Sequence, residues 1–459
     1  MPPTVRTRNT FAVQLPAGVP LREPGESIPL SPFDAYWVAL PPVRRVFLFG
    51  PPPGPGIPFA EVVRALACSL ERVIPAFHPF AGVLTYSPES RAVSIVLQEG
   101  ACSVAFVEAE ADIKFERLVE EGTEHDEDAL LQLVPDIKRD ELPAPVMAVQ
   151  VTEFVGGGVA VGVTVHHAVA DGRGLWAFLE MWAAAAGVQG GGRVATSPIP
   201  TPLHDRRLVS FRGDEQLTRL FLLHVAPDLP IIRQQNPAAE QGSPLSRRTF
   251  TFAAPTVRLP KQRLTVAGTG GGKAPSTFAS LAAHGWVSIA RAKGFTDDAL
   301  VFAFFLANCR AHMSPPVPGA YSGNCVAGCL VSLRGSELTG PSGHARAVQA
   351  IAEAVTEVKR DPLGDSTNWR SKFAAIPAGR AVILAGSPWF PAYGVDFGFG
   401  KPARVELASM NHDGEMVLVA GREAGSVQAS VAITQDKMTA FRDMFVLDCT
   451  HAMAVTESH

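Results

Sequence analysis

The sequence predicts an α/β protein with mixed sheets and flanking helices, divided into two domains. Its 459 residues are more than one ordinary hydrophobic core accommodates. Strand-like and helix-like stretches follow one another in both halves, as in layered folds that combine sheets with helices. Residues 187–206 are rich in glycine and proline and favour the start of a long connection between the halves.

In the first half, residues 59–74 carry apolar side chains at helical spacing and predict an amphipathic helix. Residues 110–131 are acidic and helical in composition, and residues 174–186 predict a helix that packs back on the strands before it. Three glycines at 156–158 predict a hairpin-like turn. Strands are expected at residues 80–86, 92–97, 103–107, 146–154 and 158–166.

The crossover continues to about residue 245 and contains one helical piece near 214–224. We therefore expect an N-terminal domain at residues 1–200, a linker at 201–245 and a C-terminal domain at 246–459. In the second half, helices are expected at residues 276–293, 344–360 and 438–445. Strands are expected at residues 299–309, 323–333, 403–407, 415–420 and 427–433.

Composition narrows the function classes. The formal net charge is −4 and no basic stripe with interleaved aromatic residues occurs, so we expect no nucleic-acid partner. No apolar run reaches the roughly 18 residues of a membrane-spanning helix, so we expect no membrane partner. The six cysteines are scattered, as in a reduced, cytoplasmic protein. Because no exposed heptad pattern is present, we expect a monomer.

The N-terminus predicts no secretory signal. Arg6 and Arg8 are not followed by the apolar stretch that such a signal needs. No acidic residue precedes Glu23, so a transit peptide is left open on composition alone.

The candidate catalytic residue is His167, in the run His-His-Ala-Val-Ala-Asp-Gly at residues 166–172. A β-branched stretch before it predicts a strand, and the residues after it predict a helix. A histidine at a strand end can be aimed rigidly at a substrate and titrates near neutral pH, as a general base must. His166 is one residue earlier, so its side chain should point to the opposite face. Taken alone, a buried core histidine is the competing interpretation.

A second segment supports the catalytic interpretation. Residues 396–402, Asp-Phe-Gly-Phe-Gly-Lys-Pro, form a Gly-rich aromatic turn near the C-terminus. The two segments together resemble the BAHD acyltransferases, which move an acyl group from coenzyme A to an alcohol or amine. That family carries His-x-x-x-Asp-Gly in mid-chain and Asp-Phe-Gly-Trp-Gly near its end. Further segments resemble the family pattern in the same order, at residues 30–34 with Trp37, 41–47, 69–70, 79–82, 308–310, 315–318 and 321–325.

The resemblance implies two domains of the chloramphenicol-acetyltransferase type, joined by a long crossover, with an active-site tunnel between them. It implies acyl-CoA as co-substrate, a small-molecule acceptor and no permanently bound cofactor or metal. His167 would remove a proton from the acceptor. Asp171 would turn away from the substrate and pair with Arg310 of the second domain, because an aspartate in an apolar interior needs a cationic partner.

Residues next to these motifs have expected roles as well. We expect Gly172 to let the chain turn sharply into the following helix. Similarity to glycoside malonyltransferases implies that Arg173 pairs with a malonyl carboxylate, the alternative being a surface arginine. Residues 268–273 fail the spacing of a phosphate-binding P-loop. The resemblance implies that Lys273, Ser276 and Thr277 contact CoA at a helix N-terminus, although Ser276 is equally well explained as a helix cap.

The C-terminal turn is expected to be structural. Asp396 should brace it, and Gly398 and Gly400 should allow close backbone packing. Phe399 occupies the place of the family's usual tryptophan. Because phenylalanine has no donor, it cannot hydrogen-bond an oxyanion.

The favoured reaction is transfer of a malonyl group, with hydroxycinnamoyl second, to a hydroxyl of a phenolic or flavonoid glycoside. Two alternatives are kept: an amine acceptor, and a non-catalytic ligand-binding relative, for which Phe399 and Ser322 in place of the usual phenylalanine leave room. His166, His167 and Asp171 lack the third-ligand spacing of a zinc site, so no metal is expected.

Overall fold

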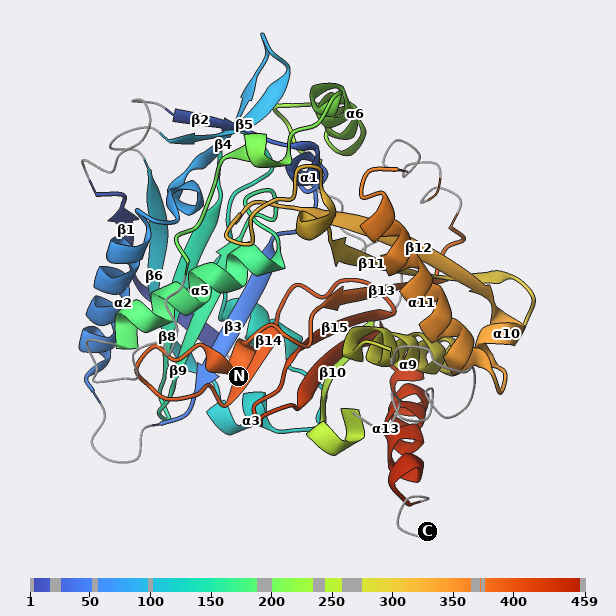
Figure 1. The fold of residues 1–459 in the computed structure, drawn as a ribbon. Helices are drawn as coiled ribbons and strands as arrows, with labels where there is room; N and C mark the ends of the chain where they lie inside the picture. The colour runs from blue at the N-terminus through green and yellow to red at the C-terminus, as the bar shows by residue number, and fades with distance from the viewer. Residues whose placement is uncertain are drawn as a thin grey trace.

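The computed structural model describes residues 4–16, 26–51, 57–97, 102–187, 200–233, 244–257, 275–364, 372 and 376–454. Two six-stranded sheets dominate it, and helices pack against both (Figure 1). The fold is therefore mixed α/β, as the sequence predicts. In Figure 1 the blue-to-green part of the chain holds most of one sheet, and the yellow-to-red part holds the other.

The first sheet has the order β1-β6-β8-β9-β3-β14. Its strands are β1 (Thr4–Gln14), β6 (Ser103–Asp112), β8 (Met147–Phe154), β9 (Val159–Val165), β3 (Val43–Phe49) and β14 (Arg404–Leu407). Neighbouring strands are antiparallel except β6 and β8, which are parallel. The edge strand β14 comes from the far end of the chain, so the C-terminal part completes this sheet.

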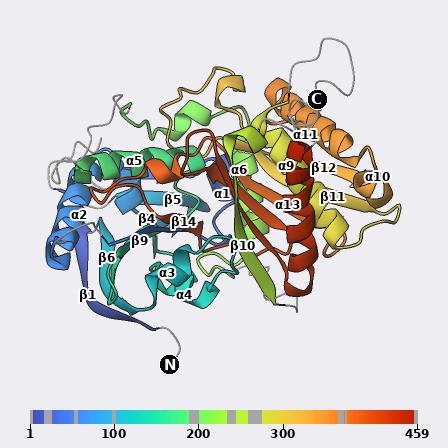
Figure 2. The same cartoon turned by 90° about the horizontal axis from the view of Figure 1, so that it is seen from below.

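Helices cover both faces of the first sheet. The helices α5 (Gly172–Gly187) and α2 (Phe59–Val73) lie on one face, and α3 (Phe115–Val119) and α4 (Glu127–Gln132) lie on the other (Figure 2). The fully buried Trp182 of α5 donates a hydrogen bond from its indole to the main-chain oxygen of Leu66 in α2. Phe397 packs 4.7 Å from Trp182, edge to face, so residues near the C-terminus also enter this core.

A small sheet lies beside the first one. Its order is β2-β5-β4-β7, from β2 (Glu26–Pro29), β5 (Ala92–Leu97), β4 (Val83–Ser87) and β7 (Ala144–Pro145). The short helix α1 (Pro32–Ala35) follows β2, and α6 (Asp214–Val225) packs against it.

The second sheet has the order β10-β16-β15-β13-β11-β12. Its strands are β10 (Leu245–Phe252), β16 (Val427–Thr434), β15 (Glu415–Ala420), β13 (Ala381–Gly386), β11 (Leu300–Asn308) and β12 (Val326–Arg334). Its helices are α9 (Thr277–Ala292), α10 (Gly335–Thr339), α11 (Gly343–Arg360) and α13 (Met438–Ala454). Trp286 of α9 is fully buried in the core of this half.

Short 3₁₀ turns connect several of these elements. They are η1 (His78–Ala81), η2 (Arg206–Val209), η3 (Arg310–His312), η5 (Ala392–Gly394) and η6 (Gln435–Lys437).

Most predicted elements are present, with three corrections. Residues 110–131 are not one helix: β6 continues to residue 112, and two short helices follow, separated by a loop. Residues 80–82 belong to η1 and its cap, so the strand predicted there begins at residue 83. The strand predicted from residue 323 begins at residue 326, because residues 323–325 form side-chain and main-chain contacts at the site.

Five strands were not predicted, namely β1, β2, β7, β10 and β13, and β3 was noted only within a segment that resembles the family pattern. β1 is an edge strand with mostly exposed side chains, so its sequence lacks a buried apolar pattern. β13 is six residues long and lies inside the second sheet with parallel neighbours. The division of the chain at residues 201–245 stays a prediction. None of the helices in the described part of the chain has the length and apolar character that crossing a bilayer requires.

Candidate active site

A cavity of about 1990 Å³ lies between the two large sheets. Residues of β3, β9 and β14 line it on one side, and residues of β11, β13 and β15 line it on the other. One face of α5 forms a further wall. This is the place where the resemblance puts a tunnel between two domains.

His167 projects into this cavity from the loop that follows β9. β9 ends at residue 165, so the rigid sheet determines where the loop begins. Nδ1 of the imidazole is buried and, among the described residues, has no hydrogen-bond partner of good geometry, whereas Nε2 is not buried. Nε2 is therefore the nitrogen that faces the cavity and is placed to exchange a proton with a ligand.

Trp37 lies flat on the His167 ring. The ring centroids are 3.7 Å apart and the planes differ by 12°. Trp37 also lines the cavity, so one face of the imidazole is covered while its edge stays accessible. The stacked indole holds the ring in one orientation and is placed to stabilise the imidazolium that forms during proton transfer. Sequence reasoning noted Trp37 only as part of a motif.

The surroundings keep His167 neutral at neutral pH. Burial lowers the pKa of His167 below its ordinary value because the charged ring loses hydration. Its own main-chain carbonyl, Asp171, Asn324 and Asp34 act in the opposite direction and raise the pKa, but by less than burial lowers it. A neutral imidazole with a free nitrogen is the state that a general base needs.

His166 points away from the cavity, as predicted. It is fully buried and does not line the cavity wall. Its Nδ1 accepts a hydrogen bond from the main-chain N–H of Ala168 at 3.2 Å. Burial, helped by the positive charge of Arg139, lowers the pKa of His166 to about 3, so it is a neutral core residue.

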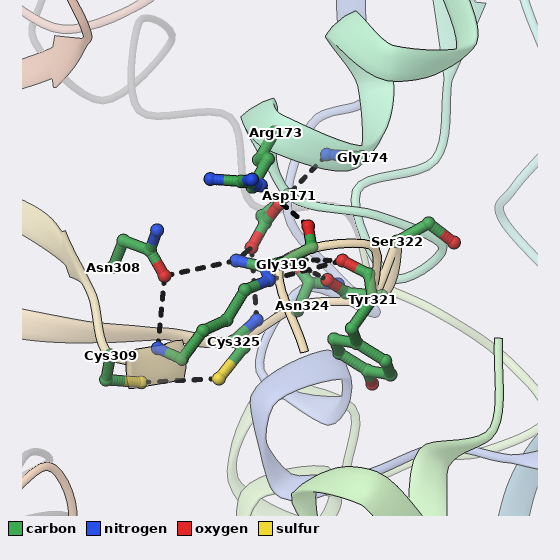
Figure 3. Close-up of polar contacts among 12 residues, drawn as sticks. Asp171, Arg173, Gly174, Asn308, Cys309, Gly319, Tyr321, Ser322, Asn324 and Cys325 are labelled. Atoms are coloured by element: carbon green, nitrogen blue, oxygen red, sulfur yellow. Dashed lines mark hydrogen bonds and ion pairs between the residues drawn. The ribbon is translucent and has the colours of Figure 1, made fainter. Parts of the chain in front are cut away.

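Asp171 forms the ion pair with Arg310 that the resemblance implies. Oδ2 accepts from Nη1 of Arg310 at 2.7 Å, and both side chains are 3% exposed. Oδ2 also accepts from the main-chain N–H of Cys325, and Oδ1 accepts from that of Gly174, which caps the first turn of α5 (Figure 3). With both oxygens occupied in this way, the carboxylate does not orient the imidazole directly.

Arg310 donates further hydrogen bonds to neighbouring main-chain oxygens. Nε and Nη2 donate to the main-chain oxygen of Tyr321, and Nη2 also donates to that of Gly323 at 2.7 Å. The loop at 321–325 and the His-bearing loop, residues 166–171, are thereby joined through the guanidinium of Arg310.

Two further side chains hold the main chain of the His-bearing loop. Nδ2 of Asn324 donates to the main-chain oxygen of His167 at 2.9 Å, and Nη2 of Arg206 donates to that of Val169 at 2.7 Å. Both are anchored by Asp34, which forms an ion pair with Arg206 at 3.2 Å and accepts from Asn324. Sequence reasoning assigned no role to this network. Its only sequence signals were Asp34 and Asn324 as parts of family motifs.

Gly172 and Arg173 begin α5. The expected role of Gly172 in a sharp turn stays a prediction: its φ is not positive, and a Cβ there would lie 2.6 Å from the ring of Phe390. Close packing against Phe390 therefore requires the glycine. Arg173 is exposed at the cavity rim, and its Nε donates to the main-chain oxygen of Gly319 at 2.9 Å (Figure 3). Its pairing with a malonyl carboxylate stays a prediction.

Asp396 braces the C-terminal turn. Oδ1 accepts from the main-chain N–H of Gly398 and of Gly400, each at 2.8 Å. Both glycines have positive φ, 101° and 86°, where other residues are strained. The expected close backbone packing is wrong for Gly400, where a Cβ would meet no atom of the described residues within 4 Å. Phe399 packs edge to face on Phe49 at 5.4 Å and, as expected, offers no donor.

The residues expected to contact CoA lie at the start of α9 where they are described. Ser276 lines the cavity, and its Oγ accepts from the N–H of Ala279 at 3.1 Å, so it is a helix N-cap. Thr277 borders a separate, smaller pocket. Lys273 lies outside the described residues. Within the described part of the chain, no group of three metal-ligating side chains comes together.

The comparisons with known proteins agree with this geometry. A family model described as "Transferase family" matches residues 20–448. The chain belongs to this family, that of the BAHD acyltransferases, and is an acyl-transferring enzyme with acyl-CoA as co-substrate.

Individual relatives share about a quarter of their residues with this chain. It is 28% identical to the malonyl-coenzyme A:anthocyanin 3-O-glucoside-6''-O-malonyltransferase of Dahlia pinnata, covering 91% of this chain and 92% of the relative. It is 26% identical to phenolic glucoside malonyltransferase 2 of Arabidopsis thaliana, covering 91% of this chain and 93% of the relative.

Solved structures share the fold. Vinorine synthase superposes with a TM-score of 0.72 at 17% identity, over 96% of this chain and 98% of that one. TRI101 of F. graminearum, complexed with coenzyme A and T-2 mycotoxin, superposes with a TM-score of 0.66 at 16% identity, over 90% of this chain and 96% of that one.

Proposed function

We propose that this acyltransferase moves a malonyl group from malonyl-CoA to a hydroxyl of a phenolic or flavonoid glycoside, with His167 as the general base. The observation that carries the proposal is the position of His167, whose free ring nitrogen faces a cavity between the two sheets. The choice of donor and acceptor is supported by the names of the relatives, which include malonyltransferases of anthocyanin and phenolic glucosides.

The proposed reaction takes place in a ternary complex. Nε2 of His167 takes the proton of the acceptor hydroxyl while that oxygen attacks the thioester carbonyl carbon. The tetrahedral intermediate collapses, the carbon–sulfur bond breaks, and the leaving thiolate receives the proton from the imidazolium. The products are the ester and free CoA. Base assistance of this kind contributes roughly 10²- to 10⁴-fold to the rate.

The loop geometry supports this role. The hydrogen bond from Asn324 holds the main chain at His167, and the ion pair between Asp171 and Arg310 holds it four residues later. Removing one partner of such a buried pair leaves a lone charge, so the pair acts on loop structure rather than on proton transfer.

A hydroxycinnamoyl donor is the second candidate, supported by a 25% identical coumaroyltransferase of Arabidopsis thaliana. An amine acceptor is a variant of the same chemistry. We also propose a monomer in the cytoplasm, on the grounds of the scattered cysteines and the absence of a heptad pattern in the sequence.

A donor-by-acceptor screen tests the proposed function. Purified protein is mixed with malonyl-CoA or coumaroyl-CoA and with glucosylated or free phenols, and thiol release and product mass are measured. Malonylated glucosides are expected. Ligand binding without thiol release for every pair would contradict the proposal and favour a non-catalytic relative.

A further inference from the structure

Arg45 is a buried cation in the cavity wall that the reaction steps above do not use. It lies on β3, is 7% exposed and lines the same cavity as His167. Its Nε is buried without an acceptor. Within the described ranges, no carboxylate comes within ion-pair distance of its guanidinium. An uncompensated buried charge is unfavourable, so this arginine is suited to a bound anion.

The strand register explains why no acidic side chain pairs with it. Side chains alternate between the two faces of a strand, and Glu406 of β14 is opposite Val46. Glu406 therefore faces the other side of the sheet from Arg45, where Arg404 and Thr249 bind it. Burial lowers the pKa of Arg45 to about 10, with Glu406 acting in the opposite direction, so Arg45 is charged at neutral pH.

Trp176 orients the guanidinium. α5 crosses β3 (Figure 1), and Cζ of Arg45 lies 5.4 Å from the centre of the Trp176 ring. Trp176 is itself 3% exposed and packs against Phe390, with ring centres 6.0 Å apart. An arginine held on an aromatic face has fewer orientations, and its planar fork of N–H groups matches the two oxygens of a carboxylate.

The spacing from His167 suits a short acyl chain. Arg45 pairs with Val163, four residues before His167 along the neighbouring strand. At 3.3 Å per residue, the two Cα positions are at most roughly 13 Å apart along the strand direction, because β9 ends at residue 165 and the chain turns after it. The side chains of both residues line the cavity, so an acyl group bound there can contact the imidazole and the guanidinium together. A thioester carbonyl at His167 with a carboxylate one carbon further is the short acyl chain that this arrangement suits.

We propose that Arg45 binds the free carboxylate of a dicarboxylic acyl group and thereby selects malonyl-CoA over neutral acyl-CoA. The inference rests on the malonyl donor proposed above. It assigns this task to Arg45 rather than to Arg173, which is exposed and already donates its Nε to Gly319.

The test compares malonyl-CoA with acetyl-CoA, which lacks the carboxylate, using one neutral phenolic glucoside as acceptor. kcat/KM is measured for wild type, Arg45→Gln, Arg45→Lys and Arg173→Gln. The matched control is Arg44→Gln, on the same strand but the opposite face, where Arg44 contacts Asp136. Arg45→Gln is expected to lower the malonyl-to-acetyl ratio of kcat/KM by roughly 10- to 100-fold, as for a lost charged hydrogen bond. Arg44→Gln is expected to leave the ratio unchanged.

Acetyl-CoA turnover reports whether each variant is folded. If Arg45→Gln does not fold, Arg45→Lys provides the test. Lysine keeps the positive charge but lacks the planar fork of N–H groups, so this variant should still lower the malonyl-to-acetyl ratio of kcat/KM. This inference would be overturned if the malonyl-to-acetyl ratio of kcat/KM were unchanged in the Arg45 variants, or if it fell in Arg173→Gln alone. Neither result would contradict malonyl-CoA as the donor. A wild type that turns over acetyl-CoA but not malonyl-CoA would overturn the proposed donor and this inference together.

Discussion

Trp37 lies in parallel contact with His167, with 3.7 Å between the ring centres. A planar neighbour at this distance leaves the imidazole little freedom to tilt, and a small misplacement of a catalytic group lowers the rate strongly. Replacing Trp37 with leucine is expected to lower kcat roughly 10- to 100-fold. Phe is expected to retain most of the activity, because it keeps a stacked ring. The measurement is kcat and KM for both variants, with thermal melting to verify folding. Wild-type kcat in Trp37→Leu would contradict this role.

The ion pair between Asp171 and Arg310 is expected to act on stability. Asp171→Ala leaves a buried guanidinium without its anion and should lower the free energy of unfolding by about 3–5 kcal/mol. Asp171→Asn keeps the shape and an acceptor oxygen, so it should retain some activity. Urea unfolding and initial rates separate the two effects. A stable, fully folded Asp171→Ala protein without activity would instead indicate that Asp171 orients the imidazole.

The partly buried position of His167 determines the pH dependence of the reaction. Because burial lowers the pKa of His167 below 6.5, the neutral base persists into mildly acidic solution. The acid limb of kcat/KM is therefore expected to have its midpoint below pH 6.5, with a plateau above it. Initial rates from pH 5 to 8, each with a check that the enzyme regains full activity at pH 7.5, provide the measurement. A midpoint above pH 6.5 would contradict the assignment.

His166 makes the fold sensitive to acid. Burial lowers its pKa to about 3, whereas the unfolded chain binds the proton near pH 6.5. Between those values the unfolded state binds more protons, so stability falls as the pH falls. From pH 7 to pH 5 this one histidine should cost about 2 kcal/mol of the free energy of unfolding. Urea unfolding should show a correspondingly smaller loss in His166→Gln. An equal loss in both proteins would refute the assignment.

The elements with strong local patterns could be predicted from the sequence. The helix expected at residues 59–74 is α2, and the strand, turn and helix around His167 are β9, the loop and α5. β1 could not be predicted, because an exposed edge strand has no buried face and its sequence therefore lacks an apolar pattern. The pairing of β14 with β3 is a contact between residues about 360 positions apart in the chain, and no local pattern encodes it.

Only the site residues that lie within sequence motifs could be predicted. The motifs named His167, Asp171 and Arg310, and the structure brings the last two together. The hydrogen bonds of Asn324 and Arg206 to the His-bearing loop depend on loops folding against one another. Arg45 was not predicted either, since a charged residue in a strand is ordinarily placed on the solvated face.

Replacement of His167 by alanine removes the proposed general base. Thiol release from the preferred acyl-CoA and acceptor pair is measured for wild type and His167→Ala, with melting temperatures compared. A loss of at least roughly 10²-fold in kcat is expected, with the fold intact. A folded His167→Ala enzyme that turns over at the wild-type rate would contradict the role of His167 as the general base.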